Sequence, residues 1–265
     1  MRLIHYTNLE ALVSIIETQT LRLTDARYLN DSQEMKEGFD YIGKQIKLSE
    51  YAQSTDKYLK QAHRIFENEF NNFATFSERE EPAFLCSFSS SSDLLSQWRS
   101  YGMFAIEFEP TYIQYSNFNI LECKYTDEDK ERLAQERVSQ AICEIAQLVS
   151  LGEFGENYLA VIDEVQKFNA SLKHMSFHEE KEFRHVESVS ANSQNIKFRA
   201  DNNLLKPYID KSFCLESVKA IHVGPVKEKY QTQKALERLI GIRRDYENTN
   251  IEHEIPVICS EIPFQ

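Results

Sequence analysis

Four short polar clusters in the chain combine histidine, hydroxyl, carboxylate and aromatic side chains, which are the residue types that hold ligands and perform catalysis. They are His5-Tyr6-Thr7, Asn30-Asp31-Ser32-Gln33-Glu34, the segment 86–102, and Glu179-Glu180-Lys181-Glu182-Phe183-Arg184. Each cluster also has a structural interpretation, so the chemistry has to be judged from residue types and spacing, cluster by cluster.

The acidic cluster alternates two carboxylates with an arginine. On a β-strand, the period of two would place Glu180, Glu182 and Arg184 on one face, with Lys181 and Phe183 on the other. Neighbouring carboxylates repel each other and Arg184 offsets that repulsion, so the pattern indicates a tuned ionisation state. On this interpretation, replacing Glu182 by Gln relieves repulsion and leaves the fold intact. A solvated edge strand is the structural alternative.

The segment 86–102 joins a hydroxyl-rich stretch to the only tryptophan of the chain. Trp98 lies one residue from Arg99 and three from Tyr101. This combination suits stacking against a planar ring together with pairing to an anion. Ordinary turn chemistry after a strand is the structural alternative for the serines that follow Cys86.

The two remaining clusters are weaker signals. His5 ends an apolar segment that we expect to be a strand, and a histidine at such a place is often a satisfied structural residue. Asn30 or Asp31, followed by Glu34, forms the pattern of a capping box at a helix start. These residues are therefore candidates for a site and equally for local structure.

The elements that would position these clusters predict an α+β fold with a mixed or antiparallel sheet. Strands cluster without strict alternation with helices, which argues against a doubly wound parallel sheet. Asn8 and Asp93 are expected to cap helices. The expected strands are 2–6, 21–24, 83–88, 103–108 with 120–125 as its neighbour, 181–189, 196–199, 206–209, 218–223 and 254–259, and helices are expected after Asn8, at about 35–76, after Asp93, at about 127–171 and at 230–242. We expect a single domain over 1–265, with 35–76 and 127–171 as helical insertions that pack on each other or form a lobe beside the site.

Composition limits the function classes. The formal net charge is −12, which argues against general nucleic-acid binding because a phosphate backbone would be repelled. No apolar stretch approaches the roughly 18 residues of a membrane span, and no signal segment is evident, so we expect a cytoplasmic protein. Five cysteines show no C-x-x-C pair, and seven glycines form no phosphate-binding loop. A nucleotide would have to be held by other groups.

The four clusters, in this order, resemble a bacterial family known as domain of unknown function 2971. The matching patterns are H-Y-T, N-D-x-x-E, C-x-F-S followed by D-x-x-x-x-W-R-x-Y, E-x-E-x-R, Val223-Gly224-Pro225 and the terminal Ser260-Glu261-Ile262-Pro263-Phe264. The resemblance spans nearly the whole chain, except that the helical segments 41–76 and 127–171 match nothing specific. Gln265 departs from the family, where a basic residue is expected.

That family is similar in fold to ADP-ribosyltransferases, which split NAD between nicotinamide and ribose. The resemblance implies His5, with Tyr6 and Thr7, for the ribose hydroxyls, and Ser87 or Ser89 on the serine-bearing strand. It further implies Tyr101 or Trp98 for nicotinamide stacking and Glu182 as catalytic carboxylate, acting on an acceptor that the sequence does not identify. Loss of nicotinamide builds positive charge on the ribose, which a carboxylate stabilises. In that chemistry Glu180 would activate the acceptor and Arg184 would hold the two glutamates in place or meet a phosphate. Arg99 would bind the pyrophosphate, and Asn30 and Asp31 would contribute to NAD binding.

Two other classes remain open. A metal-dependent hydrolase could use His5, Asp31, Glu34, Glu180 and Glu182 as ligands, although their spacing matches no established metal motif and we expect no metal. A non-catalytic nucleotide-binding or sensor protein could hold the ligand in the same pocket without turning it over. Sensitivity to a chelator would favour the first, and intact ligand recovered with the protein would favour the second.

Overall fold

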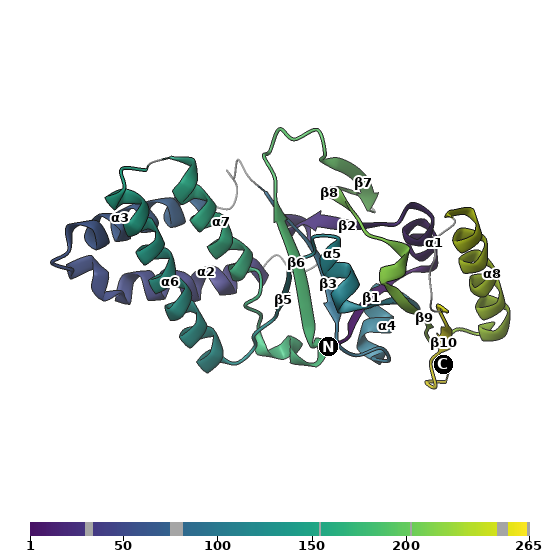
Figure 1. The fold of residues 1–265 in the computed structure, drawn as a ribbon. Helices are drawn as coiled ribbons and strands as arrows, with labels where there is room; N and C mark the ends of the chain where they lie inside the picture. Colours follow the sequence, from purple (N-terminus) through teal and green to yellow (C-terminus); the bar gives the residue numbers. More distant parts are fainter. Residues whose placement is uncertain (30–33, 75–81, 154, 202, 248–253, 264–265) are drawn as a thin grey trace.

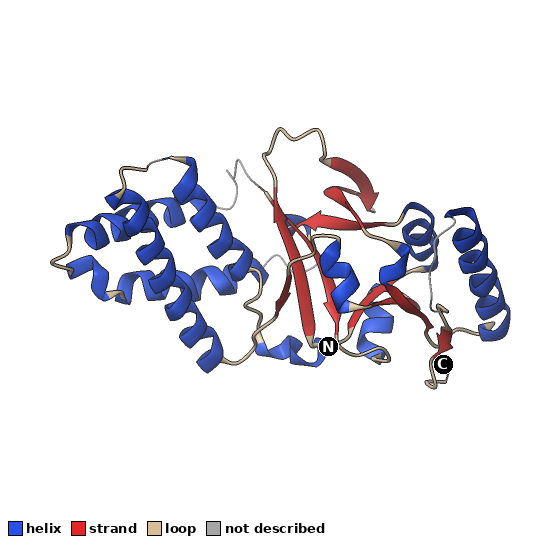
Figure 2. Ribbon diagram, viewed as in Figure 1, coloured by secondary structure: helices blue, strands red, loops and turns tan. Residues whose placement is uncertain are grey.

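A branched β-sheet with a helical lobe beside it makes up the molecule (Figures 1 and 2). The computed structural model describes residues 1–29, 34–74, 82–153, 155–201, 203–247 and 254–263. In the described residues the sheet has ten strands, and every pairing is antiparallel except that of β9 with β10. The prediction of an α+β fold with a mixed, mostly antiparallel sheet is confirmed.

The strands follow the spatial order β10-β9-β4-β1-β3-β2-β8-β7, while β6 pairs with β3, and β5 with β6. Their bounds are β1 Leu3–Thr7, β2 Thr20–Asp25, β3 Ala83–Ser89, β4 Phe104–Phe108, β5 Ile120–Glu122, β6 Glu182–Ser188, β7 Lys197–Asp201, β8 Leu204–Ser212, β9 Val218–Val223 and β10 Val257–Cys259. All ten segments expected as strands contain one, because alternating or continuous β-branched and aromatic residues mark each.

The sheet branches at β3. One edge of β3 pairs over its whole length with β6, from Ala83 opposite Ser188 to Ser89 opposite Glu182. The other edge is shared, since β2 pairs only with Phe84 and Leu85, and β1 only with Ser89. The registers of these described strands leave residues 86–88 without a strand partner on that edge. The sheet therefore splits where β1 and β2 diverge.

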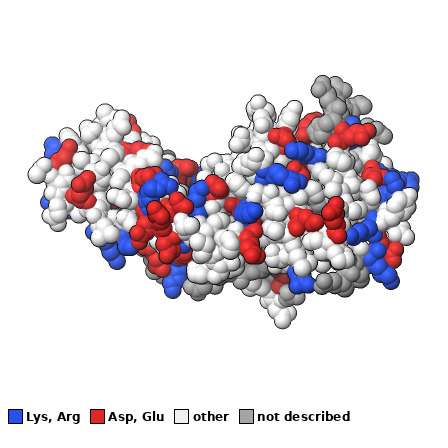
Figure 3. Space-filling view, turned by 90° about the horizontal axis from the view of Figure 1, so that it is seen from below, with Lys and Arg blue, Asp and Glu red and all other residues white. Residues whose placement is uncertain are grey.

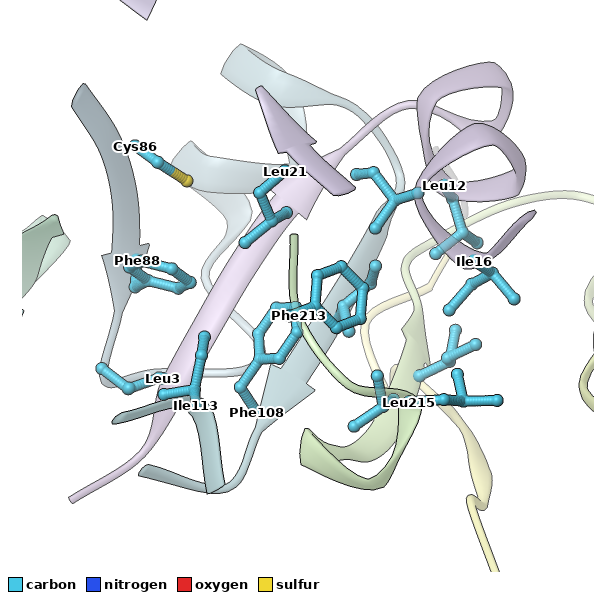
Figure 4. Close-up of a cluster of buried hydrophobic side chains, with 14 of the residues drawn as sticks. Leu3, Leu12, Ile16, Leu21, Cys86, Phe88, Phe108, Ile113, Phe213 and Leu215 are labelled. Atoms are coloured by element: carbon cyan, nitrogen blue, oxygen red, sulfur yellow. The ribbon is translucent and has the colours of Figure 1, made fainter. Parts of the chain in front are cut away.

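One apolar core lies under the strands on either side of the split. It is covered by α1 (Leu9–Thr18), α5 (Pro110–Tyr115) and α8 (Lys229–Glu247), which contribute buried aliphatic side chains. Figure 4 shows this core, with Leu12 and Ile16 of α1 beside aromatic residues such as Phe108 and Phe213. As predicted, the Asn8 side chain caps α1 by accepting from the amide of Ala11.

A second core holds the helical lobe together. It joins α2 (Glu34–Leu48), α3 (Lys57–Ala74), α6 (Asp127–Ser150) and α7 (Glu156–Asn169). The segments expected as helical insertions therefore pack on each other, as predicted from their apolar stripes. This core continues onto the sheet through Ala83, Leu85 and Val186, so the lobe is seated against β3 and β6.

Two local predictions are wrong. β5 pairs with β6 rather than with β4, because both edges of β4 are occupied by β1 and β9. Asp93 does not cap α4 (Leu95–Tyr101), whose N-cap is Leu94 without a side-chain hydrogen bond. The Asp93 carboxylate instead accepts a hydrogen bond from the indole Nε1 of Trp98 at 2.8 Å.

Gly224→Ala should destabilise the protein. A Cβ atom there would lie 2.9 Å from the Trp98 ring, which is 1% exposed and cannot move aside. We expect a loss of about 1–3 kcal/mol, the usual cost of overpacking a core. Gly241→Ala in α8 is the control, because nothing lies within 4 Å and alanine favours the helix by roughly 1 kcal/mol. Urea unfolding of both variants measures the contrast, and equal midpoints would contradict it.

Candidate functional site

A cavity of about 640 Å³ lies at the split of the sheet. Its walls come from β1, β2, β3 and β6, from β7 and β8 on the far side, and from α1 and α4. The lining includes Cys86, Ser87 and Phe88, which are the residues of β3 that lack a strand partner on that edge. The divergence of β1 and β2 therefore creates the hollow.

Three of the four polar clusters reach this cavity. The cross-strand registers explain part of the convergence, because Ser87 lies opposite Arg184 and Ser89 opposite Glu182. Asn30 and Asp31 fall outside the described residues. Trp98 and Arg99 do not line the cavity, whereas the lining does include His5, Tyr6, Thr7, Ser87, Ser89, Tyr101, Glu180, Glu182 and Arg184.

A buried cluster of paired charges lies at one side of the cavity. The Glu182 carboxylate accepts from Nε and Nη2 of Arg184 at 2.8 and 3.0 Å, and from Nζ of Lys173 at 2.5 Å. The same Nζ donates to Glu180 at 2.7 Å. Burial raises the pKa of Glu182, but the charges of Arg184 and Lys173 outweigh it and lower that pKa to about 2. Glu182 is therefore an ionised carboxylate at neutral pH.

The predicted strand face of Glu180, Glu182 and Arg184 is only partly correct. β6 begins at Glu182, while Glu180 ends a 3-10 helix (Met175–Glu180). Between them Lys181 has a φ of 44°, in the left-handed region, which breaks the strand period. Glu180 reaches the cluster through Lys173. Lys173 was not among the residues predicted from the sequence. Its one sequence signal is that it closely follows the apolar residues Ala170 and Leu172, which the structure buries.

His5 is a neutral hydrogen-bonding group. Its Nδ1 lies 3.0 Å from the carbonyl oxygen of Ser87, which can only accept, so we assign the proton to Nδ1. Burial lowers the pKa of His5. The imidazole then retains an acceptor lone pair on Nε2. A ribose hydroxyl is a suitable donor to that nitrogen.

The two candidate serines differ in their hydrogen bonds. The Ser89 hydroxyl donates to the Glu180 carbonyl at 2.7 Å and accepts from the Ser91 amide at 3.1 Å. Ser89 thereby fastens the end of the 3-10 helix to β3, which is a structural role. Ser87 lines the cavity half-buried and makes no comparable side-chain bond within the described chain.

The aromatic segment divides between core and cavity. Trp98 is buried, and its ring meets that of Tyr6 edge-on with the centroids 4.6 Å apart, so of the two alternatives for stacking on a ligand only Tyr101 lines the cavity. Tyr6 donates to the Ser91 carbonyl at 2.7 Å, and burial raises its pKa to about 12. Arg99 is exposed and outside the cavity lining. Tyr101, 42% exposed, remains as the ring at the mouth of the cavity.

One wall of the cavity is basic, and its residues were not predicted from the sequence. Arg22, Arg199 and Lys206 line the cavity from β2, β7 and β8, together with Asp201. Two aromatic side chains, Tyr28 and Phe177, complete the lining around the carboxylates and arginines. Each of these cations is a single residue on a different strand, so no local sequence motif marks them. The pairing of β2 with β8 and of β8 with β7 brings them together.

Three further observations bear on the predicted classes. In the part of the chain that the structure describes, no three His, Cys, Asp or Glu side chains are grouped as metal ligands, so the hydrolase alternative gains no support. No described helix has the length and apolarity to cross a membrane. On the face drawn in Figure 3, acidic and basic side chains are interspersed rather than separated.

Comparison with models of known families, with curated proteins and with solved structures finds no match to this chain. The geometry of the cavity is therefore what bears on function.

Lys173→Met should destabilise the fold by about 3–5 kcal/mol, the usual cost of removing one partner from a buried ion pair. The change leaves Glu182 and Glu180 facing each other with Arg184 as the cation. Lys167→Met is the matched control, since Lys167 binds Asp163 and Glu164 near the surface, where such pairs contribute at most about 1 kcal/mol. Urea unfolding at pH 7 measures both, and similar losses would contradict a buried cluster.

The deficit of Lys173→Met should also depend on pH. Because the pKa of folded Glu182 is lowered to about 2, its stabilisation is complete above the ordinary pKa near 4.5 and is lost as pH falls towards 2. Removing Lys173 raises that pKa and shrinks this contribution. The difference in unfolding free energy between variant and wild type should therefore narrow between pH 4.5 and 2. A constant difference across that range would show that Lys173 does not act on the Glu182 charge.

Proposed function

We propose that the cavity binds NAD or a closely related dinucleotide and that the protein cleaves the bond between nicotinamide and ribose, as an ADP-ribosyltransferase or an NAD glycohydrolase. The observation that carries the proposal is the convergence of His5, Ser87, Tyr101 and an ionised Glu182 on one cavity. These residues come from three of the motifs that resemble domain of unknown function 2971. The proposal includes membership of that family and an ADP-ribosyltransferase-like fold.

The side chains divide the task. His5 accepts a hydrogen bond from a ribose hydroxyl through Nε2, and Tyr101 stacks against the nicotinamide ring. As the C–N bond breaks, its electron pair leaves with the nicotinamide nitrogen and positive charge develops on the ribose. The Glu182 carboxylate stabilises that charge electrostatically. With a pKa near 2 it stays ionised and transfers no proton at neutral pH.

The acceptor then attacks the ribose carbon. Water gives ADP-ribose, and a hydroxyl or amine of a macromolecule gives a transferred ADP-ribosyl group. The proton of the acceptor leaves to Glu180, which lines the cavity with its side chain 20% exposed. The cavity volume of about 640 Å³ lies within the roughly 300–1,000 Å³ of typical cofactor sites.

Binding without turnover is the second candidate, and a specific feature favours it. The two cations of Lys173 and Arg184 offset the two negative charges of Glu180 and Glu182. A neutralised pair stabilises a developing positive charge less than a free carboxylate does. Incubation with NAD followed by mass measurement of protein and small molecules separates the candidates. Released nicotinamide supports cleavage, whereas bound, intact NAD supports a binding protein.

Glu182→Asp tests the carboxylate directly. It keeps the charge for Lys173 and Arg184 but withdraws the oxygens by one methylene, so nicotinamide release should fall by about 100-fold, the scale of a misplaced catalytic group. Glu182→Gln should lower release by about 100- to 1,000-fold. Contrary to the expectation from sequence, the Gln variant should also lose stability, because it leaves two buried cations with one carboxylate.

Glu179→Gln is the matched control, since Glu179 is exposed and lies outside the cavity lining. Release rates are compared per folded molecule, with thermal unfolding measured on every variant. Unchanged release by Glu182→Asp and Glu182→Gln would remove Glu182 from the mechanism.

A further inference from the structure

We propose that Arg22, Arg199 and Lys206 form an anion subsite that binds the pyrophosphate of the dinucleotide. The three side chains line the same cavity from β2, β7 and β8, away from the Glu182 cluster. The class of ligand rests on the proposed function, but the subsite itself is argued from the basic wall. It replaces Arg99, the residue that the sequence suggested for this role and that lies outside the cavity.

Arg199 carries an unsatisfied donor. Its Nη2 donates to the Thr24 hydroxyl at 3.2 Å, which orients the guanidinium. Its Nε is buried and, within the described part of the chain, has no hydrogen-bond partner. Buried donors in native proteins are nearly always bonded, and an unmatched one costs free energy. Arg199 lines the cavity, so a rotation of its side chain towards a bound anion would give this N–H a phosphate oxygen as acceptor, in a charge-assisted hydrogen bond.

The guanidinium of Arg22 is oriented by an aromatic ring. It lies over the Tyr208 ring, 5.1 Å from the ring centroid. Asp210 lies opposite Arg22 across the β2–β8 pairing, but its carboxylate forms its ion pair with Lys197, at 2.7 Å. Stacking of this kind orients a guanidinium while leaving its edge for a bidentate anion.

Lys206 adds a third positive charge from inside the wall. Its side chain is 11% exposed and bonds Asp201 at 2.8 Å. Three cations and one carboxylate leave this wall with two net positive charges, in a chain whose net charge is −12. Such a local excess in a concave, partly buried site attracts anions despite the overall charge.

The distance between the basic wall and the Glu182 carboxylate favours an extended ligand. Thr24, which binds Arg199, lies opposite Leu85 in β3, while Glu182 lies opposite Ser89. Four residues at about 3.3 Å each separate these positions by roughly 13 Å. A free phosphate could occupy only the basic wall. A dinucleotide can place its pyrophosphate there and its nicotinamide ribose at the carboxylates.

Calorimetric titration with inorganic pyrophosphate, ADP-ribose and NAD tests the subsite. Arg199→Gln and Arg22→Gln should each weaken binding of all three by at least about tenfold, the effect of losing one charge-assisted contact. Arg99→Gln is the matched control and should bind like wild type. Arg199→Lys keeps the charge and serves if the Gln variant folds poorly, with binding weakened but less than in Arg199→Gln. Raising the salt concentration should weaken binding to wild type.

The outcomes separate the subsite from the proposed function. Pyrophosphate binding that is lost in the cavity variants supports the subsite even if wild type releases no nicotinamide. Nicotinamide release with equal affinity of wild type, Arg199→Gln and Arg22→Gln for NAD would overturn the subsite while leaving the proposed function standing. Absence of pyrophosphate and ADP-ribose binding to wild type would also overturn the subsite.

Discussion

The buried ion cluster of Lys173, Glu182 and Arg184 is the interaction on which both the site and the arrangement of the molecule depend. Arg184 donates from Nη1 to the carbonyl of Ala170, just after α7, while Glu182 begins β6. Lys173 follows α7 and its carbonyl accepts from Lys130 of α6. The cluster therefore connects the helical lobe to the sheet. Because charges so far from water are costly unless paired, the lobe and the strand are held in one relative position.

The branching of the sheet at β3 explains why a cavity exists there. A strand has two edges, and β6 takes one of them completely. β1 and β2 must share the other, and each pairs with only a short part of it. The hollow between them is lined by the paired Glu182 and Arg184 of β6 and by the cations of β2, β7 and β8, so a charge-balanced end faces a basic one. The basic end would suit the phosphates of the proposed ligand, and the Glu182 carboxylate would lie beside its ribose.

Much of the secondary structure was predictable because its causes are local. The strand at 218–223 is found as expected, Asn8 caps its helix, and the apolar stripes of 127–171 form α6 and α7. His5, Ser87 and Tyr101 were identified by type and were found lining one cavity. They could be identified because each belongs to an element that the local sequence predicts: His5 to β1, Ser87 to β3 and Tyr101 to the end of α4. The split of the sheet could not be predicted in this way, since it depends on how two strands distant in sequence, β1 and β2, share one edge of β3.

The sequence by itself determined the elements and the chemical types available, because periodicity, capping and charge act over a few residues. Only the tertiary structure decided which side chains meet the cavity. Trp98 and Arg99 are adjacent, but packing of α4 against β1 buries the first and leaves the second exposed outside the cavity. Arg22 and Arg199 are 177 positions apart and reach the same wall through β8. Strand pairing joins residues at any separation in sequence, so a local sequence pattern cannot predict it.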